Sequence, residues 1–110
     1  MDTAQLSLNL RNSGINRAVE HADVTHDDWS TQAYSLFETY VRYISFQETF
    51  QIEDFRDWAR GRRLPEPPSK RAFGFIPLKA ARAGLIEKHG YAQVSNPKAH
   101  MANATVWRRK

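Results

Sequence analysis

Basic side chains concentrate in one stretch of the sequence, between residues 60 and 82. They are Arg60, Arg62, Arg63, Lys70, Arg71, Lys79 and Arg82, and Glu66 is the one acidic residue among them. Lys and Arg neutralise phosphates and release the counterions that a nucleic acid holds, so such a cluster favours binding to a polyanion. The stretch therefore predicts a DNA-binding surface, and the alternative is a basic helix face that is simply solvated.

The charge of the whole chain is distributed unevenly along it. Residues 1–50 contain 3 basic and 7 acidic side chains, whereas residues 51–110 contain 13 basic and 5 acidic ones. The formal net charge of +4 is the sum of −4 for the first half and +8 for the second. Such an asymmetry indicates one face that attracts a polyanion, and a basic surface that only keeps the protein in solution is the alternative.

A helix that begins after Ser69 and ends before Gly84 would position most of the basic side chains. Ser69 can cap it, and Gly84 is the natural terminator. The residues expected to be buried are Ala72, Phe73, Ile76, Ala80 and Ala83. The residues expected to be exposed are Lys70, Arg71, Phe75, Lys79 and Arg82. Because Pro77 lies inside this pattern, we expect the helix to be kinked or divided into two pieces.

Three residues of this helix could contact bases as well as phosphates. Lys70 and Arg71 lie near its N-terminus, the end of such a helix that usually meets bases, and Arg can bind O6 and N7 of guanine together. Phe75 could contact a thymine methyl group or stack on an unpaired base. The alternative for Phe75 is that the kink at Pro77 turns it into the core.

The sequence before this helix predicts other elements that would support it. Met1–Asn12 is polar and without a useful period, and we expect a loose tail there. Helical spacing of apolar residues predicts a short helix over Gly14–Asp23 and a central helix from about Trp29 to Ser45. Phe46–Gln51 could be extended, and a further short helix would start near Ile52.

The predicted core combines the apolar stripes of these helices. It consists of Trp29, Phe37, Tyr40, Phe55, Trp58, Phe73 and Ile76. Gly61 is a plausible C′ residue for the short helix. The sequence LPEPPS that follows cannot continue a helix, because its three prolines lack the amide proton.

The C-terminal part predicts two strands, Leu85–Val94 and Ala104–Arg108, joined by the polar loop Ser95–Asn103. Lys98 and His100 in this loop could reach a phosphate or the minor groove. The alternative is an ordinary hairpin loop with exposed side chains.

The basic C-terminus, Arg108–Lys110, extends the positive charge beyond the second strand, so we include Arg108 among the expected DNA contacts. The alternative is a frayed terminus that contacts nothing.

The sequence resembles a group of small phage-encoded winged-helix proteins over about Gly14–Arg109. The segments that carry the resemblance are FQIEDFRDWARGRRLPEPPSKRAFG, ARAGLIEKHGY and VWRR. The expected order of elements is also that of a winged helix-turn-helix. This resemblance implies an α+β fold, mainly α, with an extra N-terminal helix and a C-terminal β-hairpin wing, forming a single domain over residues 13–110. Pro77 and Leu78 depart from the pattern, where a basic or aliphatic residue would be expected.

The resemblance also implies a DNA-associated role in phage replication, recombination or control. In that fold the second helix of the motif enters the major groove and the wing contacts the neighbouring backbone. We expect duplex DNA rather than single-stranded DNA as the partner. The alternative function is a protein-interaction module, because winged helices bind proteins through the same surfaces. The acidic N-terminal half would suit a protein partner.

Other classes of function find little support in the sequence. There is no Cys, the four His residues lack metal-ligand spacing, and no phosphate-binding or nucleophile motif occurs. We therefore expect no metal, no cofactor and no enzymatic activity. No apolar run is long enough to span a membrane, and no signal peptide is visible, so the expected location is the cytoplasm and no membrane partner is expected.

Overall fold

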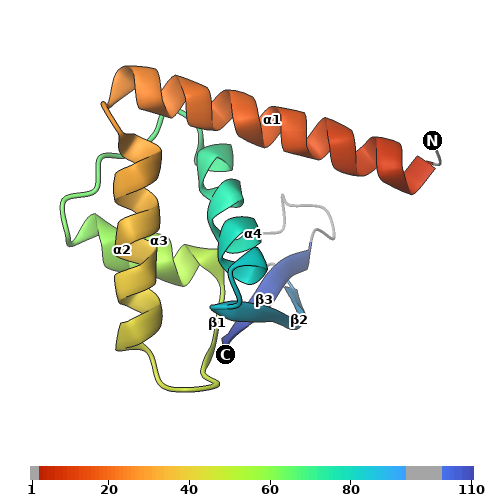
Figure 1. Cartoon of the computed structure of the whole chain (residues 1–110), viewed down its shortest axis with the longest axis vertical. Helices are drawn as coiled ribbons and strands as arrows, with labels where there is room; N and C mark the ends of the chain where they lie inside the picture. Colours follow the sequence, from red (N-terminus) through yellow and green to blue (C-terminus); the bar gives the residue numbers. More distant parts are fainter. Residues whose placement is uncertain (1–2, 94–102) are drawn as a thin grey trace.

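The computed structural model describes residues 3–93 and 103–110, which form an α+β fold that is mainly helical (Figure 1). Its elements are α1 (Thr3–Thr25), α2 (Trp29–Tyr43), β1 (Thr49–Phe50), α3 (Ile52–Arg60), the 3₁₀ helix η1 (Lys70–Gly74), α4 (Phe75–Arg82), β2 (Ile86–Gln93) and β3 (Asn103–Arg109). The predicted fold class, α+β and mainly α, is confirmed.

Helix α1 is much longer than the sequence predicted. It begins at Thr3, whereas the prediction placed a loose tail over Met1–Asn12 and started the helix at Gly14. No Pro interrupts the added part, and its Ala, Leu, Gln and Arg residues favour helix, so a helix docked through its C-terminal half can propagate backward. The prediction that this stretch is irregular is therefore wrong from Thr3 onward.

The core forms around α2, as predicted. Trp29, Phe37 and Tyr40 are buried on one face of this helix, and Phe55 of α3 is fully buried against them. The Phe37 and Phe55 rings meet edge to face, with centroids 5.1 Å apart. Trp58 is the exception among the predicted core residues, because it is only partly buried.

Burial also sets the ionisation of one core residue. Burial, and to a smaller extent the carboxylate of Asp54, raises the pKa of Tyr40 to about 12. Tyr40 therefore stays neutral at physiological pH, and its ring packs edge to face with that of Phe50 at a centroid distance of 5.4 Å.

The helix predicted between Ser69 and Gly84, hereafter the basic helix, is divided into two pieces, η1 and α4, as the position of Pro77 predicted. Helix η1 ends at Gly74 and α4 starts at Phe75, which places Pro77 in the first turn of α4, where a missing amide proton costs little. Ser69 caps η1, since its hydroxyl accepts a hydrogen bond from the Arg71 amide at 3.2 Å. Ala83 is exposed rather than buried as predicted, because α4 ends one residue before it.

The turn between α3 and η1 differs from the prediction at its first residues. Gly61 ends α3 with an ordinary right-handed φ of −74°, so its expected role as a left-handed C′ residue is wrong. Arg63 has the positive φ instead, 64°. The turn is fixed to the core further along, where the Trp29 indole nitrogen donates a 2.7 Å hydrogen bond to the Pro65 carbonyl.

The three strands form an antiparallel sheet in the order β1-β3-β2. Thr49 of β1 faces Arg108 of β3, and Glu87 of β2 faces the same Arg108 from the other side. The register of β2 shifts between Lys88 and Gly90, as in a β-bulge. The two predicted strands are thus confirmed in the described residues, whereas the residues of the loop between them, 94–102, lie outside the described part.

Helix α1 crosses the start of the basic helix (Figure 1). The side chain of Ile15 rests directly on the backbone of Gly74, at the junction of η1 and α4. This close approach depends on the missing side chain of Gly74, and it fixes α1 against the helix that carries most of the candidate DNA contacts.

Replacing Gly74 with Ala should lower the free energy of unfolding by about 1–3 kcal/mol. A Cβ atom at this position would lie 2.9 Å from Cδ1 and 3.1 Å from Cγ1 of Ile15. The φ angle of Gly74 is −64°, which any residue can adopt, so the collision alone causes the loss. Urea denaturation followed by circular dichroism measures it.

Two variants control this prediction. Gly61→Ala should be nearly neutral, because its Cβ would meet only the Trp58 carbonyl oxygen, at an ordinary 3.7 Å. Adding Ile15→Val to Gly74→Ala removes the closest methyl group and should recover part of the loss. If Gly74→Ala has the same free energy of unfolding as the parent protein, α1 does not pack this closely on Gly74.

Candidate nucleic-acid interface

Two clefts flank the contact between α1 and the basic helix, and four of the predicted basic residues divide between them. The larger cleft, about 580 Å³, lies between α1, α3 and η1 and contains Lys70 and Arg71. The smaller one, about 320 Å³, lies between α1 and α4 and contains Lys79 and Arg82. Ile15 of α1 lines both. Among the described residues, none that lines either cleft is acidic.

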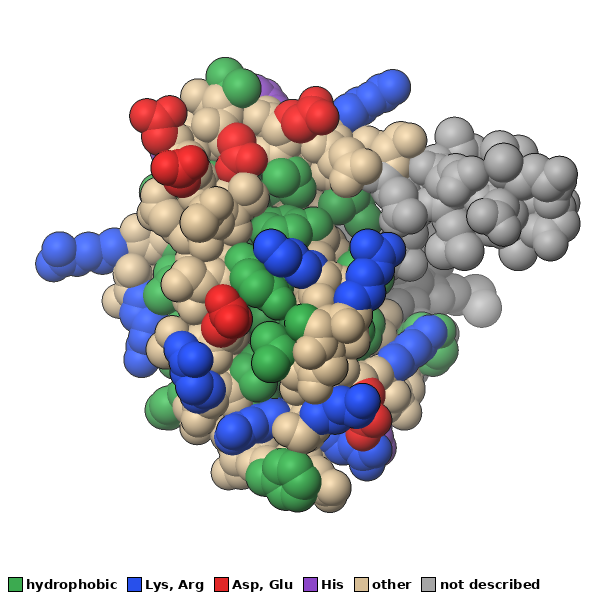
Figure 2. Space-filling model, viewed as in Figure 1, with side chains coloured by type: hydrophobic (Ala, Val, Ile, Leu, Met, Phe, Trp, Pro, Cys, Tyr) green, Lys and Arg blue, Asp and Glu red, His purple; other side chains and the backbone are tan. Residues whose placement is uncertain are grey.

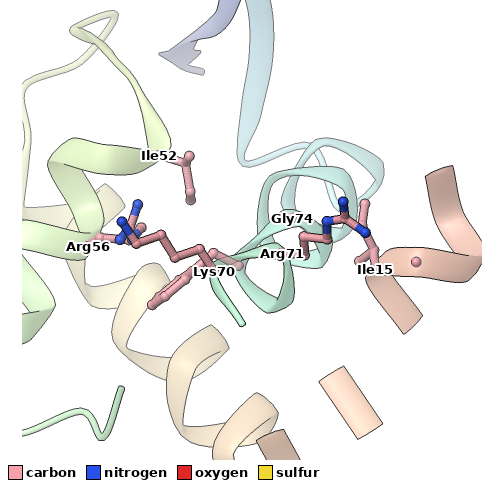
Figure 3. Close-up of a pocket in the computed structure, with 8 residues that line it drawn as sticks. Ile15, Ile52, Arg56, Lys70, Arg71 and Gly74 are labelled. Atoms are coloured by element: carbon pink, nitrogen blue, oxygen red, sulfur yellow. The ribbon is translucent and has the colours of Figure 1, made fainter. Parts of the chain in front are cut away.

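The larger cleft, hereafter the cationic cleft, combines three cations with an apolar floor. Figure 3 shows the side chains of Arg56 and Lys70 extending toward the same region from α3 and η1, while Arg71 extends toward α1. Ile52 supplies apolar surface on the side of Arg56 and Lys70, and Ile15 supplies it on the side of Arg71. An anion can approach several cations at once here, next to groups that exclude water, which strengthens their attraction.

Arg56 was not among the residues predicted to form the site. Its guanidinium carbon lies 5.2 Å from the centroid of the Phe73 ring, and its Nε is buried without a hydrogen-bond partner in the described structure. The sequence contained a signal for it, because Ile52, Phe55, Arg56 and Ala59 follow the spacing of one helix face. An Arg on an otherwise apolar face is a candidate for a partly buried binding group.

The smaller cleft holds the other pair of predicted cations. Lys79 and Arg82 are exposed on α4, where Leu78 and Phe75 form the apolar part of the surface. The ammonium group of Lys79 lies 4.3 Å from the centroid of the Tyr34 ring, close enough for a cation–π interaction. Burial, and secondarily the Glu38 carboxylate, raises the pKa of Tyr34, so the ring remains neutral beneath this charge.

Phe75 is not the exposed side chain that helical spacing predicted. It is half-buried and packs against the core, with its ring centroid 6.4 Å from that of Trp29. The cause is that residues 70–74 form a 3₁₀ helix, which has about 3.0 rather than 3.6 residues per turn, so the residues after it face a different direction from those of one continuous α-helix. Phe75 still lines the smaller cleft, so part of its side chain remains accessible there.

The arginines that follow α3 are placed differently from the four cations of the basic helix. Arg62 lies over the Trp58 ring, 3.7 Å from its centroid. Arg60 forms ion pairs with Asp57 at 3.6 Å and Glu66 at 3.4 Å, which reduces the charge it offers to a ligand. Arg62 and Arg63 are exposed, and neither lines the two clefts.

Arg108 is less available than the sequence suggested. It forms an ion pair with Glu87 across the sheet, with its Nε donating to Oε1 at 2.8 Å. Such a pair neutralises much of the charge that a phosphate would otherwise meet. Lys98 and His100, the two predicted contacts of the loop, lie outside the described residues.

Comparisons with known proteins leave the site to be interpreted from its own geometry. No protein-family model, no curated protein and no solved structure matches the chain. Within residues 3–93 and 103–110, no three His, Asp or Glu side chains lie close enough together to hold a metal ion. No helix in the described part of the chain is both long and apolar enough to span a membrane.

The charges of the molecule are separated in space as well as in sequence. Figure 2 shows most acidic side chains of the visible face gathered at the end where α1 meets α2, whereas Lys and Arg occupy much of the remaining surface. The four cations of the basic helix, Lys70, Arg71, Lys79 and Arg82, are all exposed. We call these four residues the basic surface.

Proposed function

We propose that the chain is a non-enzymatic winged-helix protein that binds DNA through the basic surface. The observation that carries this proposal is the set of four exposed cations on η1 and α4, next to clefts that the described acidic residues do not line. A phosphate backbone would satisfy these charges and release its counterions.

The arrangement of elements supports a winged-helix interpretation. Helix α2, strand β1, helix α3, the η1–α4 pair and the β2–β3 strands follow one another in the order expected for that fold, and β3 lies in the middle of the sheet. In such a fold η1–α4 would be the DNA-facing helix and β2–β3 the wing. The resemblance of the sequence to small phage-encoded winged-helix proteins supports a role in phage replication, recombination or regulation.

The position of α1 favours contacts with the DNA backbone over deep insertion of the basic helix. Ile15 packs on Gly74, and the Arg71 guanidinium lies beside Gly14, where a Cβ atom would be 3.7 Å from Nη1. The start of the basic helix is therefore partly occupied by another helix, which leaves less room for bases. We propose that phosphate contacts supply most of the affinity and that duplex DNA is the preferred partner.

A salt titration of DNA binding tests this proposal. Fluorescence anisotropy with a labelled duplex should give a log–log slope of about −0.9 per phosphate contact, or about −3.6 for four contacts. A single strand of the same length should bind more weakly, and polyglutamate of similar charge should compete poorly, since it lacks the spacing of a duplex backbone.

Two results of this titration would contradict the proposal. One is the absence of duplex binding at low salt. The other is that polyglutamate displaces the labelled duplex as well as unlabelled duplex DNA does, which would mean that the basic surface attracts any polyanion. Either result would favour the second candidate function, a protein-interaction module. That candidate has its own support in Tyr43 and Phe46, two large aromatic side chains exposed near the end of α2.

A further inference from the structure

The cationic cleft lacks an anion within the described part of its own chain. Among the described residues, ion pairs are formed by Arg60 and Arg108, and neither lines this cleft. Arg56 and Lys70 therefore direct like charges toward the same region, where they repel one another until an anion enters, and Arg71 adds a third cation on the α1 side of the cleft (Figure 3). Since Ile15 and Ile52 form apolar surface in the same space, the best occupant carries a negative charge and an aliphatic group together.

Such a group is present at the C-terminal end of α1 and just after it. Val24 is 83% exposed on the last turn of that helix, which makes it the most exposed large apolar side chain among the described residues. Glu20 lies one turn before it on the same face, and Asp27 and Asp28 follow it. All three acidic residues are exposed. We call these four residues the acidic end.

The neighbouring Asp23 has a structural role, whereas the three carboxylates of the acidic end have no such partner in the described part of the chain. Asp23 accepts hydrogen bonds from the backbone amide and the hydroxyl of Ser30, both at 2.8 Å, and so fixes the start of α2. No described side chain forms an ion pair with Glu20, Asp27 or Asp28. Their charges remain available to a partner.

The acidic end cannot reach the cationic cleft of its own chain. Gly14 in the cleft and Val24 in the acidic end belong to one continuous helix, which separates them by about 15 Å at a rise of about 1.5 Å per residue. A contact between the two surfaces must therefore join two molecules. Because the two surfaces differ, the contact is heterologous and can repeat from molecule to molecule.

We propose that the acidic end of one copy of this protein docks into the cationic cleft of a second copy. Val24 occupies the apolar floor near Ile52, and the three exposed carboxylates face the cations of the cleft. Lys70 and Arg71 take part in both this contact and the basic surface, so DNA and the second copy compete for them. Self-association consequently weakens when DNA is bound, and it weakens as salt rises.

Sedimentation velocity of the full chain tests the contact. At about 50 mM salt the mean mass should increase with protein concentration, and at about 500 mM salt it should fall toward that of one chain. The two variants Glu20→Gln/Asp27→Asn and Lys70→Gln/Arg71→Gln should each associate at least about tenfold more weakly than the parent. The matched variant Glu48→Gln/Glu53→Gln, which removes two exposed carboxylates elsewhere, should associate like the parent.

Mixing the two deficient variants gives the decisive result. One retains an intact cleft and the other an intact acidic end, so an equimolar mixture should form a complex of two chains and nothing larger. The circular dichroism spectrum of each variant should match that of the parent, which excludes unfolding as the cause of weaker association. The Glu20→Gln/Asp27→Asn variant should also bind duplex DNA like the parent, which separates this proposal from the proposed function.

Several outcomes would overturn the proposed contact. A parent protein that stays a single chain at low salt and high concentration would do so. Association that persists in both deficient variants would place the interface elsewhere, for example at Tyr43 and Phe46. A mixture that remains unassociated would show that the cleft and the acidic end are not partners, and the cleft would then be a site for DNA alone.

Discussion

Replacing Phe55 with Ala should lower the free energy of unfolding by about 3–5 kcal/mol, the largest effect on stability expected of a single substitution here. Phe55 is fully buried, and its ring contacts those of Phe37, Tyr40, Trp58 and Phe73. Because these rings come from three different helices, they cannot all move inward to fill the space that the substitution leaves. Urea denaturation gives the change directly, and the melting temperature should fall by more than about 10 °C.

Phe46→Ala provides the matched control for this substitution. It removes the same atoms from a side chain that is 70% exposed, so the free energy of unfolding should change by less than about 0.5 kcal/mol. Similar melts for the parent and Phe55→Ala would mean that the helices do not converge on Phe55. A large effect of Phe46→Ala would instead reveal a folded-state contact for that residue.

Removing all four charges of the basic surface should reduce duplex affinity by about 100-fold or more at low salt. The variant replaces Lys70, Arg71, Lys79 and Arg82 with Ala. Each cation that meets a phosphate contributes both its attraction and the release of counterions, so the magnitude of the salt slope should also fall by about 0.9 for each phosphate that is no longer neutralised. The same anisotropy titration measures both quantities.

A second quadruple variant separates this effect from the general loss of charge. Arg17, Arg42, Arg60 and Lys110 are exposed residues outside the basic surface and outside strands β2 and β3. Replacing these four with Ala removes the same net charge but should reduce affinity by less than about tenfold. If the two quadruple variants bind equally well, with circular dichroism showing both folded, the basic surface has no special role in DNA binding.

Much of the fold could be predicted because α2 has a regular apolar pattern. Trp29, Phe37 and Tyr40 recur at helical spacing, and their burial requires partners of similar size, which Phe55 and Phe73 provide. The Pro-rich turn after α3 and the division of the basic helix near Pro77 could also be predicted, because proline lacks the amide proton that a continuing helix needs. Because these features depend on residues that are close in sequence, sequence patterns predict them.

The features that escaped prediction depend on contacts between distant elements. Helix α1 extends to Thr3 because its C-terminal half is docked on η1. No local pattern in the polar residues before Gly14 predicts that contact. The half-burial of Phe75 was one of two alternatives that the break near Pro77 left open, and the packing of its ring against Trp29 of α2 decides between them. Helical spacing placed Arg56 on the apolar face of α3, but that this face meets η1 and forms a cleft there was visible only in the structure.

The sequence predicted which charged residues form the candidate site, but it did not predict the clefts in which they lie. Lys70, Arg71, Lys79 and Arg82 are exposed as expected, since each follows the polar side of its helix. Their division between two clefts arises from α1, whose position the sequence did not indicate. The pairing of Arg108 with Glu87 likewise needed the strand register.

The order of the strands has a consequence for folding during synthesis. Strand β3 lies between β1 and β2, and Thr49 finds its partner only in Arg108, near the end of the sequence. Because the chain leaves the ribosome N-terminus first, every helix emerges before the central strand, and until β3 emerges β1 and β2 lack the strand that pairs with both. The aromatic contacts among α2, α3 and the basic helix can form first, and the sheet closes last, once the ribosome has released residues 103–109.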